Sequence, residues 1–155
     1  MPNKDILLVE DNPDDRELMK LAFSKVEISH HLIVVCSGRE ALNYLQKKTD
    51  DEISDPGDRL EKSLPALVIL DLNLPKINGI EILQRIRASP KTRILPVIIL
   101  SSSDEPQDLI DSYINGCNSY IRKPIHFTQL QVFVREISAY WLTINQLPVF
   151  GVPNE

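Results

Sequence analysis

Residues 66–83 read ALVILDLNLPKINGIEIL, and this stretch decides the class of fold. Five consecutive apolar residues open it, a run typical of a strand that is covered on both faces of its sheet. The run ends at Asp71, and a loop marked by the turn residues Pro75, Asn78 and Gly79 follows. After the loop, apolar residues recur at helical spacing. A buried strand, a turn and an amphipathic helix in this order predict an α/β fold with a parallel sheet.

The same alternation continues toward both ends of the chain. Short runs rich in β-branched residues predict strands at residues 6–9, 32–35, 67–70, 97–100 and 120–121. Between and after these runs, apolar stripes predict helices, each with one face against the sheet. The stripes are Leu18, Leu21 and Ala22; Ala41, Leu42 and Leu45; Ile82, Leu83 and Ile86; Leu109, Ile110, Tyr113 and Ile114; and Leu130, Phe133, Val134, Ile137 and Trp141. The pattern predicts one doubly wound α/β domain.

Residues at the expected element boundaries agree with this pattern. Asn12, followed by Pro13 and two aspartates, is typical of a helix N-terminus whose dipole the acids complement. Gly116 stands where the fourth helix is expected to end. Residues 47–63 carry charges of both signs and few apolar side chains, so we expect a solvated loop there.

Composition argues against several classes of function. The net charge is -5, and no segment gathers basic residues into a stripe along a nucleic-acid backbone, so we expect no nucleic-acid partner. Cys36 and Cys117 lie far apart, which is typical of buried free thiols in a reducing compartment. No signal peptide is evident, and no apolar run approaches the ~20 residues of a membrane helix. We expect a soluble cytoplasmic protein without a membrane partner.

Polar side chains stand at the carboxyl ends of four predicted strands. They are Glu10 with Asp11, Asp71, Ser101 and Lys123. Sites in open α/β sheets form at this edge of the sheet, so we expect these side chains to converge. Three carboxylates that meet without a cation would repel one another, and a hard divalent ion removes that conflict.

Mg2+ suits such a cluster, because it prefers oxygen ligands and is often held by carboxylates together with phosphate oxygens. No cysteine or histidine stands near these positions, which argues against zinc, and no nucleotide-binding glycine-rich loop occurs. We therefore predict Mg2+ at Glu10, Asp11 and Asp71, with Asp71 as the nucleophile that forms an acyl phosphate. Lys123 would offer a positive charge, and Ser101 a hydroxyl, to the phosphoryl oxygens.

Four stretches of the chain resemble the response-regulator receiver domains. They are LLVEDN at residues 7–12, VILDLNLPKINGIEIL at 68–83, VIILSS at 97–102 and YIRKP at 120–124. Together they span nearly the whole chain in the order that the family shows. The resemblance implies a flavodoxin-like sheet of five parallel strands in the order 2-1-3-4-5.

The resemblance also implies a role for each matching residue. In chain order, the matches are the acidic pair Glu10 and Asp11, the phosphoacceptor Asp71, the metal-binding backbone carbonyl of Asn73, the hydroxyl switch Ser101, the aromatic switch Tyr120 and the lysine Lys123. Glu10 stands where many receivers have Asp. A histidine kinase would phosphorylate Asp71, and the receiver would catalyse only its own phosphoryl transfer and dephosphorylation.

A narrower resemblance is to the cyanobacterial phytochrome response regulators. It rests on the EDNPDD segment, the charged insertion before the third strand, the DLNLP sequence and the long C-terminal segment. This resemblance implies a light-sensing histidine kinase as partner and a homodimer. The chain after Pro124 is too short for an output domain, so we expect signalling through contacts with an unknown downstream protein.

The last predicted helix carries more apolar surface than one core needs. Besides its stripe, four residues widen the apolar face: Val132, Tyr140, Leu142 and Ile144. We expect a receiver domain over residues 1–145 and a tail over residues 146–155 that forms part of a dimer interface. The residues assigned to this interface are Phe133, Tyr140, Trp141, Leu147 and Phe150.

Three alternative functions share parts of the pattern. A phosphorelay intermediate would pass the phosphoryl group from Asp71 to a histidine phosphotransfer protein. A Mg-dependent phosphatase of the haloacid-dehalogenase type needs a second Asp two residues after its nucleophile, and this position holds Asn73. A flavin-binding module needs a phosphate-gripping loop after the first strand, where this chain has the acidic EDNPDD.

Overall fold

A computed structural model describes residues 4–50, 64–124 and 126–148 of the chain. Its centre is a sheet of five parallel strands: β1 (Asp5–Val9), β2 (His31–Val35), β3 (Leu67–Asp71), β4 (Val97–Ser101) and β5 (Ser119–Arg122). Their order is β2-β1-β3-β4-β5, which confirms the order that the resemblance implied. Each predicted strand lies inside an observed one.

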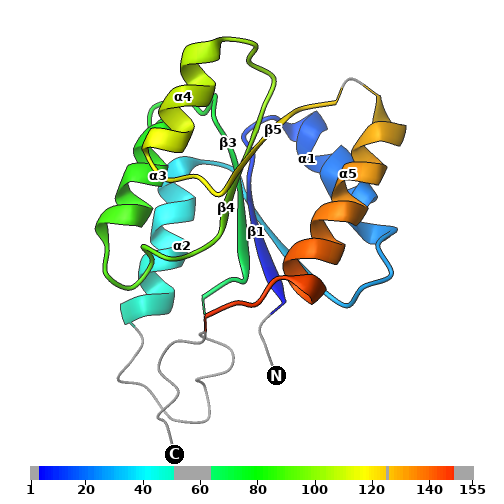
Figure 1. Ribbon diagram of the computed structural model, residues 1–155, viewed down its shortest axis with the longest axis horizontal. Coiled ribbons are helices and arrows are strands. Elements are labelled where there is room, and N and C mark those ends of the chain that lie inside the picture. Colours follow the sequence, from blue (N-terminus) through cyan, green and yellow to red (C-terminus); the bar gives the residue numbers. More distant parts are fainter. Residues whose placement is uncertain (1–3, 51–63, 125, 149–155) are drawn as a thin grey trace, which may run out of the picture.

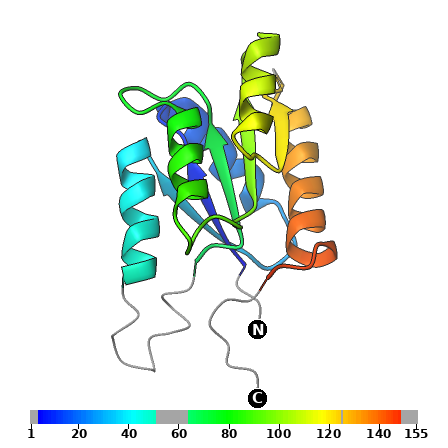
Figure 2. The same ribbon diagram turned by 60° about the vertical axis from the view of Figure 1, so that its left-hand side comes forward.

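Helices cover both faces of this sheet in the described part of the chain. They are α1 (Pro13–Ser24), α2 (Gly38–Asp50), α3 (Gly79–Ala88), α4 (Pro106–Ile114), α5 (Phe127–Ala139) and the π-helical turn η3 (Tyr140–Ile144). The helices α1 and α5 lie on one face, and α2, α3 and α4 lie on the other (Figure 1); Figure 2 shows the same layers from the side. Among the described residues, no helix combines the length and the apolar character that crossing a membrane requires.

The central strands are buried on both sides because each face of the sheet has its own core. In β1, Leu7 and Val9 pack in the core with α2 and α3, whereas Ile6 and Leu8 pack in the core with α1 and α5. Every residue of β3 and β4 is buried, and those before the last residue of each strand are all apolar. This double burial explains the unbroken apolar runs, since a polar residue at any of these positions would lose its hydration.

The predicted core face of α1 is wrong for Leu18 and Leu21 and right for Ala22. Leu18 and Leu21 are 41% and 48% exposed, while Met19, Ala22 and Phe23 are buried. Both sets of residues have helical spacing, so periodicity alone could not choose between them. The observed rotation of the helix buries the large Phe23 ring together with Met19, and this removes more apolar surface from water.

The apolar stripe of α4 was predicted to face the sheet, and this prediction is wrong at all four of its residues. The residue that α4 buries is Ser112, whose hydroxyl donates a hydrogen bond to the backbone carbonyl of Asp108. A small side chain whose polar atom is satisfied within the helix can face the sheet without cost. The predicted stripe is instead between 42% and 74% exposed and is called here the outer face of α4: Leu109, Ile110, Tyr113 and Ile114.

The C-terminal segment is packed more closely onto its own domain than the sequence suggested. Leu142, expected on the surplus surface, is buried in the core with α1 and α5. Trp141 and Leu147 are partly buried against the same core. The π-helical turn has more residues per turn than an α-helix, so it rotates Leu142 inward and leaves Tyr140 and Ile144 exposed.

Two smaller predictions are wrong: where the charged loop begins, and the burial of Cys36. The helix α2 runs to Asp50, so residues 47–50 continue a helix instead of starting the predicted loop; residues 51–63 lie outside the described part. Cys117 is buried as expected, but Cys36 is exposed. Cys36 directly follows β2, which is one of the two edge strands of the sheet, so a neighbouring strand shields it from one side only.

Candidate functional site

Three strand ends supply the charged centre of the site. Glu10 directly follows β1, Asp71 is the last residue of β3, and Lys123 directly follows β5. Because parallel strands end at the same edge of a sheet, these side chains meet. The Nζ atom of Lys123 lies 2.6 Å from Oε1 of Glu10 and 3.0 Å from Oδ2 of Asp71. The predicted convergence of these three residues is confirmed.

Asp11 completes a cluster of three carboxylates with Glu10 and Asp71. One carboxylate oxygen from each residue lies within 4.8 Å of the others. Glu10 and Asp71 are buried, and Asp11 is partly exposed, so the cluster is open to solvent on the side of Asp11. Oε2 of Glu10 is buried and accepts no hydrogen bond from a donor among the described residues. A buried carboxylate oxygen without a donor is costly, and a cluster of three carboxylates that contains such an oxygen fits a hard divalent cation.

The loop between β1 and α1 is fixed by its own side chains. Arg16 donates hydrogen bonds from Nη1 to the backbone carbonyls of Glu10 and Asp11, at 3.1 and 2.7 Å. Oδ1 of Asn12 accepts two backbone N–H groups of the first helical turn, at 2.9 and 3.1 Å, so Asn12 is the predicted N-cap. These bonds hold the backbone from which the acidic pair projects.

The loop after β3 orients the Asp71 carboxylate. Oδ1 of Asp71 accepts a hydrogen bond from the backbone N–H of Asn73 at 3.0 Å. The loop after β3 closes where the backbone of Gly79 passes close to that of Asp71 and Leu72. The N–H of Gly79 donates a hydrogen bond to the carbonyl of Leu72 at 2.9 Å. A Cβ at Gly79 would lie 2.5 Å from the Asp71 carbonyl oxygen, so only glycine fits this close return. Asn78, predicted only as a turn residue, then caps α3: its Oδ1 accepts the backbone N–H of Glu81 at 3.0 Å.

Burial and mutual contact separate the pKa values of these groups. Burial, reinforced by the hydrogen bond with Asp71, raises the pKa of Glu10 to about 8. Burial acts in the same direction on Asp71, but hydrogen bonds, with Glu10 first and Asn73 next, outweigh it and lower its pKa. The pKa of Lys123 is raised, because its bond to Glu10 and the charge of Asp71 outweigh burial. In the absence of a bound cation, Glu10 therefore holds the proton of the pair more tightly than Asp71 does.

The residues with predicted switch or ligand roles lie around this centre. Ser101 ends β4 fully buried, and its hydroxyl accepts the backbone N–H of Ser103 at 3.1 Å. Tyr120 packs partly buried against the core with α2 and α3, and its hydroxyl is buried without a partner among the described residues. The side chain of Asn73 is exposed. The roles of Ser101, Tyr120 and the Asn73 carbonyl stay predictions.

Sequence reasoning missed one charged contact of the site. Oδ2 of Asp15, in the first turn of α1, lies 3.2 Å from Nζ of Lys123. The aspartates of this turn were assigned only to the helix dipole. Asp15 belongs to the first helical turn after the acidic pair, and this closeness in sequence could have placed its side chain near that pair, although not its contact with Lys123.

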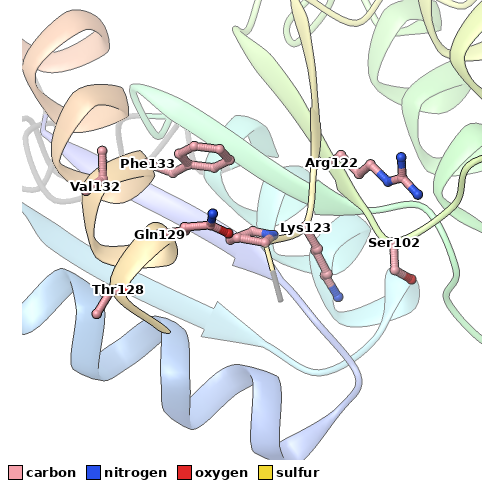
Figure 3. Close-up of a pocket in the computed structure, with 8 residues that line it drawn as sticks. Ser102, Arg122, Lys123, Thr128, Gln129, Val132 and Phe133 are labelled. Atoms are coloured by element: carbon pink, nitrogen blue, oxygen red, sulfur yellow. The ribbon is translucent and has the colours of Figure 1, made fainter. Parts of the chain in front are cut away.

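A surface pocket of about 640 Å³ opens beside Lys123, between the end of β5 and α5 (Figure 3). Val132 and Phe133 of α5 form its apolar wall, and Arg122 lies across from them at the end of β5. Arg122 also pairs with Asp104 at 3.0 Å. No sequence pattern indicated this pocket, because its lining comes from three separate segments. Phe133, predicted at a dimer interface, lines it.

Comparison with known families agrees with the fold and the site. The family model of the response regulator receiver domain matches residues 6–135. This chain therefore belongs to the response-regulator receiver family.

Two relatives align with nearly the whole chain. Response regulator Rcp1 of Synechocystis sp. is 35% identical over 147 residues, which are 95% of this chain and 95% of Rcp1. The probable methanogenesis regulatory protein FilR2 of Methanothrix harundinacea is 39% identical over 143 residues, 92% of this chain and 86% of FilR2. A sequence this similar is thus not confined to cyanobacteria.

Solved structures show the same likeness. The crystal structure of the phosphorylated cyanobacterial phytochrome response regulator RcpA has a TM-score of 0.81 and 36% identity, and covers 96% of this chain and 100% of that one. The structure of the Mn2+-bound form of Rcp1 has a TM-score of 0.78 and 35% identity, with 94% and 99% coverage. The predicted likeness to phytochrome response regulators is confirmed.

Proposed function

We propose that this chain is a phosphorylation switch in which Asp71 accepts a phosphoryl group from a phosphohistidine of a histidine kinase. The placement of Asp71 carries the proposal: its turn-oriented carboxylate belongs to the carboxylate cluster and also contacts the ammonium of Lys123. An Asp71 oxygen forms the new bond to phosphorus as the bond from phosphorus to the histidine nitrogen breaks. The chain acts on its own phosphoryl group and not on a separate substrate.

We expect Mg2+ at Glu10, Asp11 and Asp71, with the backbone carbonyl of Asn73 as a further ligand. When bound, Mg2+ neutralises the carboxylates and the charge that develops on the phosphoryl oxygens. The buried, unpartnered Oε2 of Glu10 supports a cation here. The Mn2+-bound form of Rcp1 is a precedent for a divalent ion in a similar chain.

The remaining polar residues would hold and report the phosphoryl group. Lys123 would bind one phosphoryl oxygen as a point charge. Ser101 would release the N–H of Ser103 and turn its hydroxyl toward the phosphoryl group. Tyr120 would then readjust, because its buried hydroxyl has no partner among the described residues to hold it in place. These movements would pass the signal to a downstream protein.

Likeness to Rcp1 and RcpA supports a kinase of the phytochrome type as the partner. The proposal places the chain in the cytoplasm, where such a kinase would present its phosphohistidine. The described part of the chain offers no helix that could cross a membrane, which is consistent with that place.

The experiment that tests the proposal is phosphorylation by acetyl phosphate in the presence of Mg2+, followed by phosphate-affinity electrophoresis. The wild-type chain should acquire a slower-migrating band that EDTA prevents, and Asp71→Asn should not acquire it. Asp14→Asn, which removes an exposed carboxylate outside the cluster, should behave as wild type. A slower band in Asp71→Asn of wild-type intensity would contradict the proposal.

A second copy of this chain is proposed as a further partner, bound through α5 and η3. Val132, Tyr140 and Ile144 form an exposed apolar strip there, 39%, 47% and 65% accessible. Such a strip is typical of a covered surface. Phe150, also assigned to this interface, lies outside the described residues. The other assigned residues are partly buried in their own chain: Phe133, Trp141 and Leu147.

Sedimentation velocity tests the homodimer. Replacing Tyr140 and Ile144 together by serine should lower the sedimentation coefficient to that of a monomer, since both side chains are exposed and their loss leaves the core intact. Leu18→Ser with Leu21→Ser, another exposed apolar pair, on α1, is the control and should leave the coefficient unchanged. The same coefficient for all three proteins would rule this surface out.

A further inference from the structure

All three N–H donors of the Lys123 ammonium have an acceptor in this structure. Three carboxylate oxygens accept them: Oε1 of Glu10 at 2.6 Å, Oδ2 of Asp71 at 3.0 Å and Oδ2 of Asp15 at 3.2 Å. A phosphoryl oxygen can therefore bind Lys123 only when one of these partners gives up its donor.

The three partners differ in how firmly they hold the ammonium. The side chains of Glu10 and Asp71 are 3% and 8% exposed, whereas that of Asp15 is 39% exposed. Asp15 also makes the longest of the three contacts. Water can replace a partly exposed partner of an ion pair, so such a contact breaks at the lowest cost. Asp15 is the partner that releases Lys123 most easily.

We propose that Asp15 is a positioning residue that holds the ammonium of Lys123 in the unphosphorylated protein and yields it to a phosphoryl oxygen. This inference rests on the proposed function of Asp71. Asp15 belongs to α1 and stands outside the cluster of Glu10, Asp11 and Asp71, so it engages Lys123 without taking a carboxylate from that cluster.

The contact has two opposing consequences for an anion at Asp71. Asp15 accepts from the same Nζ that contacts Asp71, and it therefore helps to hold the ammonium beside the phosphoacceptor. Its negative charge also competes for the same donor and repels an arriving anion. Because the competing charge acts directly on the donor in question, removing it should make anion binding at Asp71 tighter.

Asp14 provides a matched control in the same helical turn. The backbone N–H groups of Asp14 and Asp15 both donate to Oδ1 of Asn12, so the two residues share one capped backbone. The Asp14 side chain is exposed and forms no ion pair with Lys123 among the described residues. Asn at either position removes the same charge from the same end of the helix dipole.

Beryllofluoride with Mg2+ serves as the probe, because it mimics a phosphoryl group on an aspartate without a covalent step. Fluorine NMR titrations of the full chain give its apparent Kd. We expect Asp15→Asn to bind about threefold to fivefold more tightly than Asp14→Asn, the range that a partly exposed ion pair supports. Thermal unfolding of both variants checks that they fold alike.

A second readout follows Lys123 itself. Nitrogen NMR of its ammonium, recorded before the probe is added, should show a shift in Asp15→Asn that Asp14→Asn lacks. A residue that only supports the helix would not move this signal. Equal Kd values for the two variants, or weaker binding by Asp15→Asn, would overturn the inference while leaving the role of Asp71 intact. If the wild-type chain showed no Mg2+-dependent beryllofluoride binding, the proposed function would fall, and this inference with it.

Discussion

The helices α3 and α4 lie on the same face of the sheet and use their apolar residues in opposite ways (Figure 1). The helix α3 buries Ile82, Leu83 and Ile86 in the core that it shares with α2. The helix α4 buries Ser112 and turns its outer face to solvent, with Ile114 74% exposed. The apolar residues of α3 therefore hold the fold together, whereas those of α4 are available to another protein.

Polar contacts hold α4 in place instead. Arg87, near the end of α3, donates from Nε to the carbonyl of Gly116 at 2.8 Å and from Nη2 to Oδ1 of Asn118 at 3.0 Å. At the other end, the hydroxyl of Ser103 bonds the carboxylate of Asp108. A helix with few buried apolar atoms costs little to displace. That property suits the element that follows β4, where the phosphoryl group would be sensed.

The largest expected effect separates the two helices by stability. Leu83→Ala should lower the free energy of unfolding by about 2–5 kcal/mol, because it leaves a cavity in a core where Leu83 is fully buried. Urea denaturation followed by circular dichroism measures the change. A loss below about 1 kcal/mol would show that α3 is not the anchored helix of the pair.

A smaller loss is expected at the link between the two helices. Arg87→Ala removes the bonds to Gly116 and Asn118, together with those from Nη1 to the backbone carbonyls of Arg93 and Leu95. It leaves partly buried carbonyls without their donor, which should cost about 1–3 kcal/mol. Arg85→Ala is the control: Arg85 makes an exposed i,i+4 pair with Glu81, worth about 0–0.5 kcal/mol. Equal unfolding midpoints in urea for the two variants would show that the hydrogen bonds of Arg87 do not stabilise the fold.

The cysteines report on the segment that follows α4. Cys117 is buried, burial raises the pKa of its thiol, and its backbone N–H donates to the carbonyl of Ser112 at 3.0 Å. Cys36 is exposed. An aromatic disulfide reagent should modify Cys36 first, and the reaction of Cys117 should be slower and should require higher pH, because the thiolate is the reactive form. Peptide mass spectrometry that found both thiols modified at one rate would show this segment to be open.

The smallest effect is expected on the outer face of α4. Ile114→Ser should change the free energy of unfolding by no more than about 0.5 kcal/mol, because the side chain is already in solvent. The same urea experiment measures it beside Leu83→Ala. A loss as large as that of Leu83→Ala would mean that the outer face is covered within the folded chain, and the contrast between the helices would disappear.

The sheet and the centre of the site were predictable because their causes are local or topological. A strand covered on both faces needs consecutive apolar residues, and runs such as LVIL and VIIL show them directly. Parallel strands end at one edge, so polar residues placed after them must meet. The positions of Glu10, Asp71 and Lys123 after their strands are therefore sufficient to predict that the three side chains lie close together.

The helix faces were less predictable, and the reason is physical. Periodicity shows which residues share a side of a helix, but not which side meets the sheet. In α1 two neighbouring faces are apolar, and the fold buries the one with Phe23. In α4 the apolar side faces outward, and nothing in the spacing of Leu109 and Ile114 distinguishes this from a core stripe.

The contact between Asp15 and Lys123 was not predictable for a different reason. It joins residues that lie 108 positions apart, and it depends on the direction of a long, flexible side chain. Strand order places Lys123 near the acidic pair, yet it does not say how many carboxylates the ammonium reaches. Only the three-dimensional arrangement of α1 beside the end of β5 shows the third one.

The central claim is that Asp71 carries the phosphoryl group, and borohydride trapping tests it most directly. Acetyl phosphate and Mg2+ are added first, and sodium borohydride then reduces an aspartyl phosphate to homoserine, which peptide mass spectrometry locates. The account predicts homoserine at position 71 and at no other aspartate. Homoserine at Asp11, or at any residue other than Asp71, would contradict it.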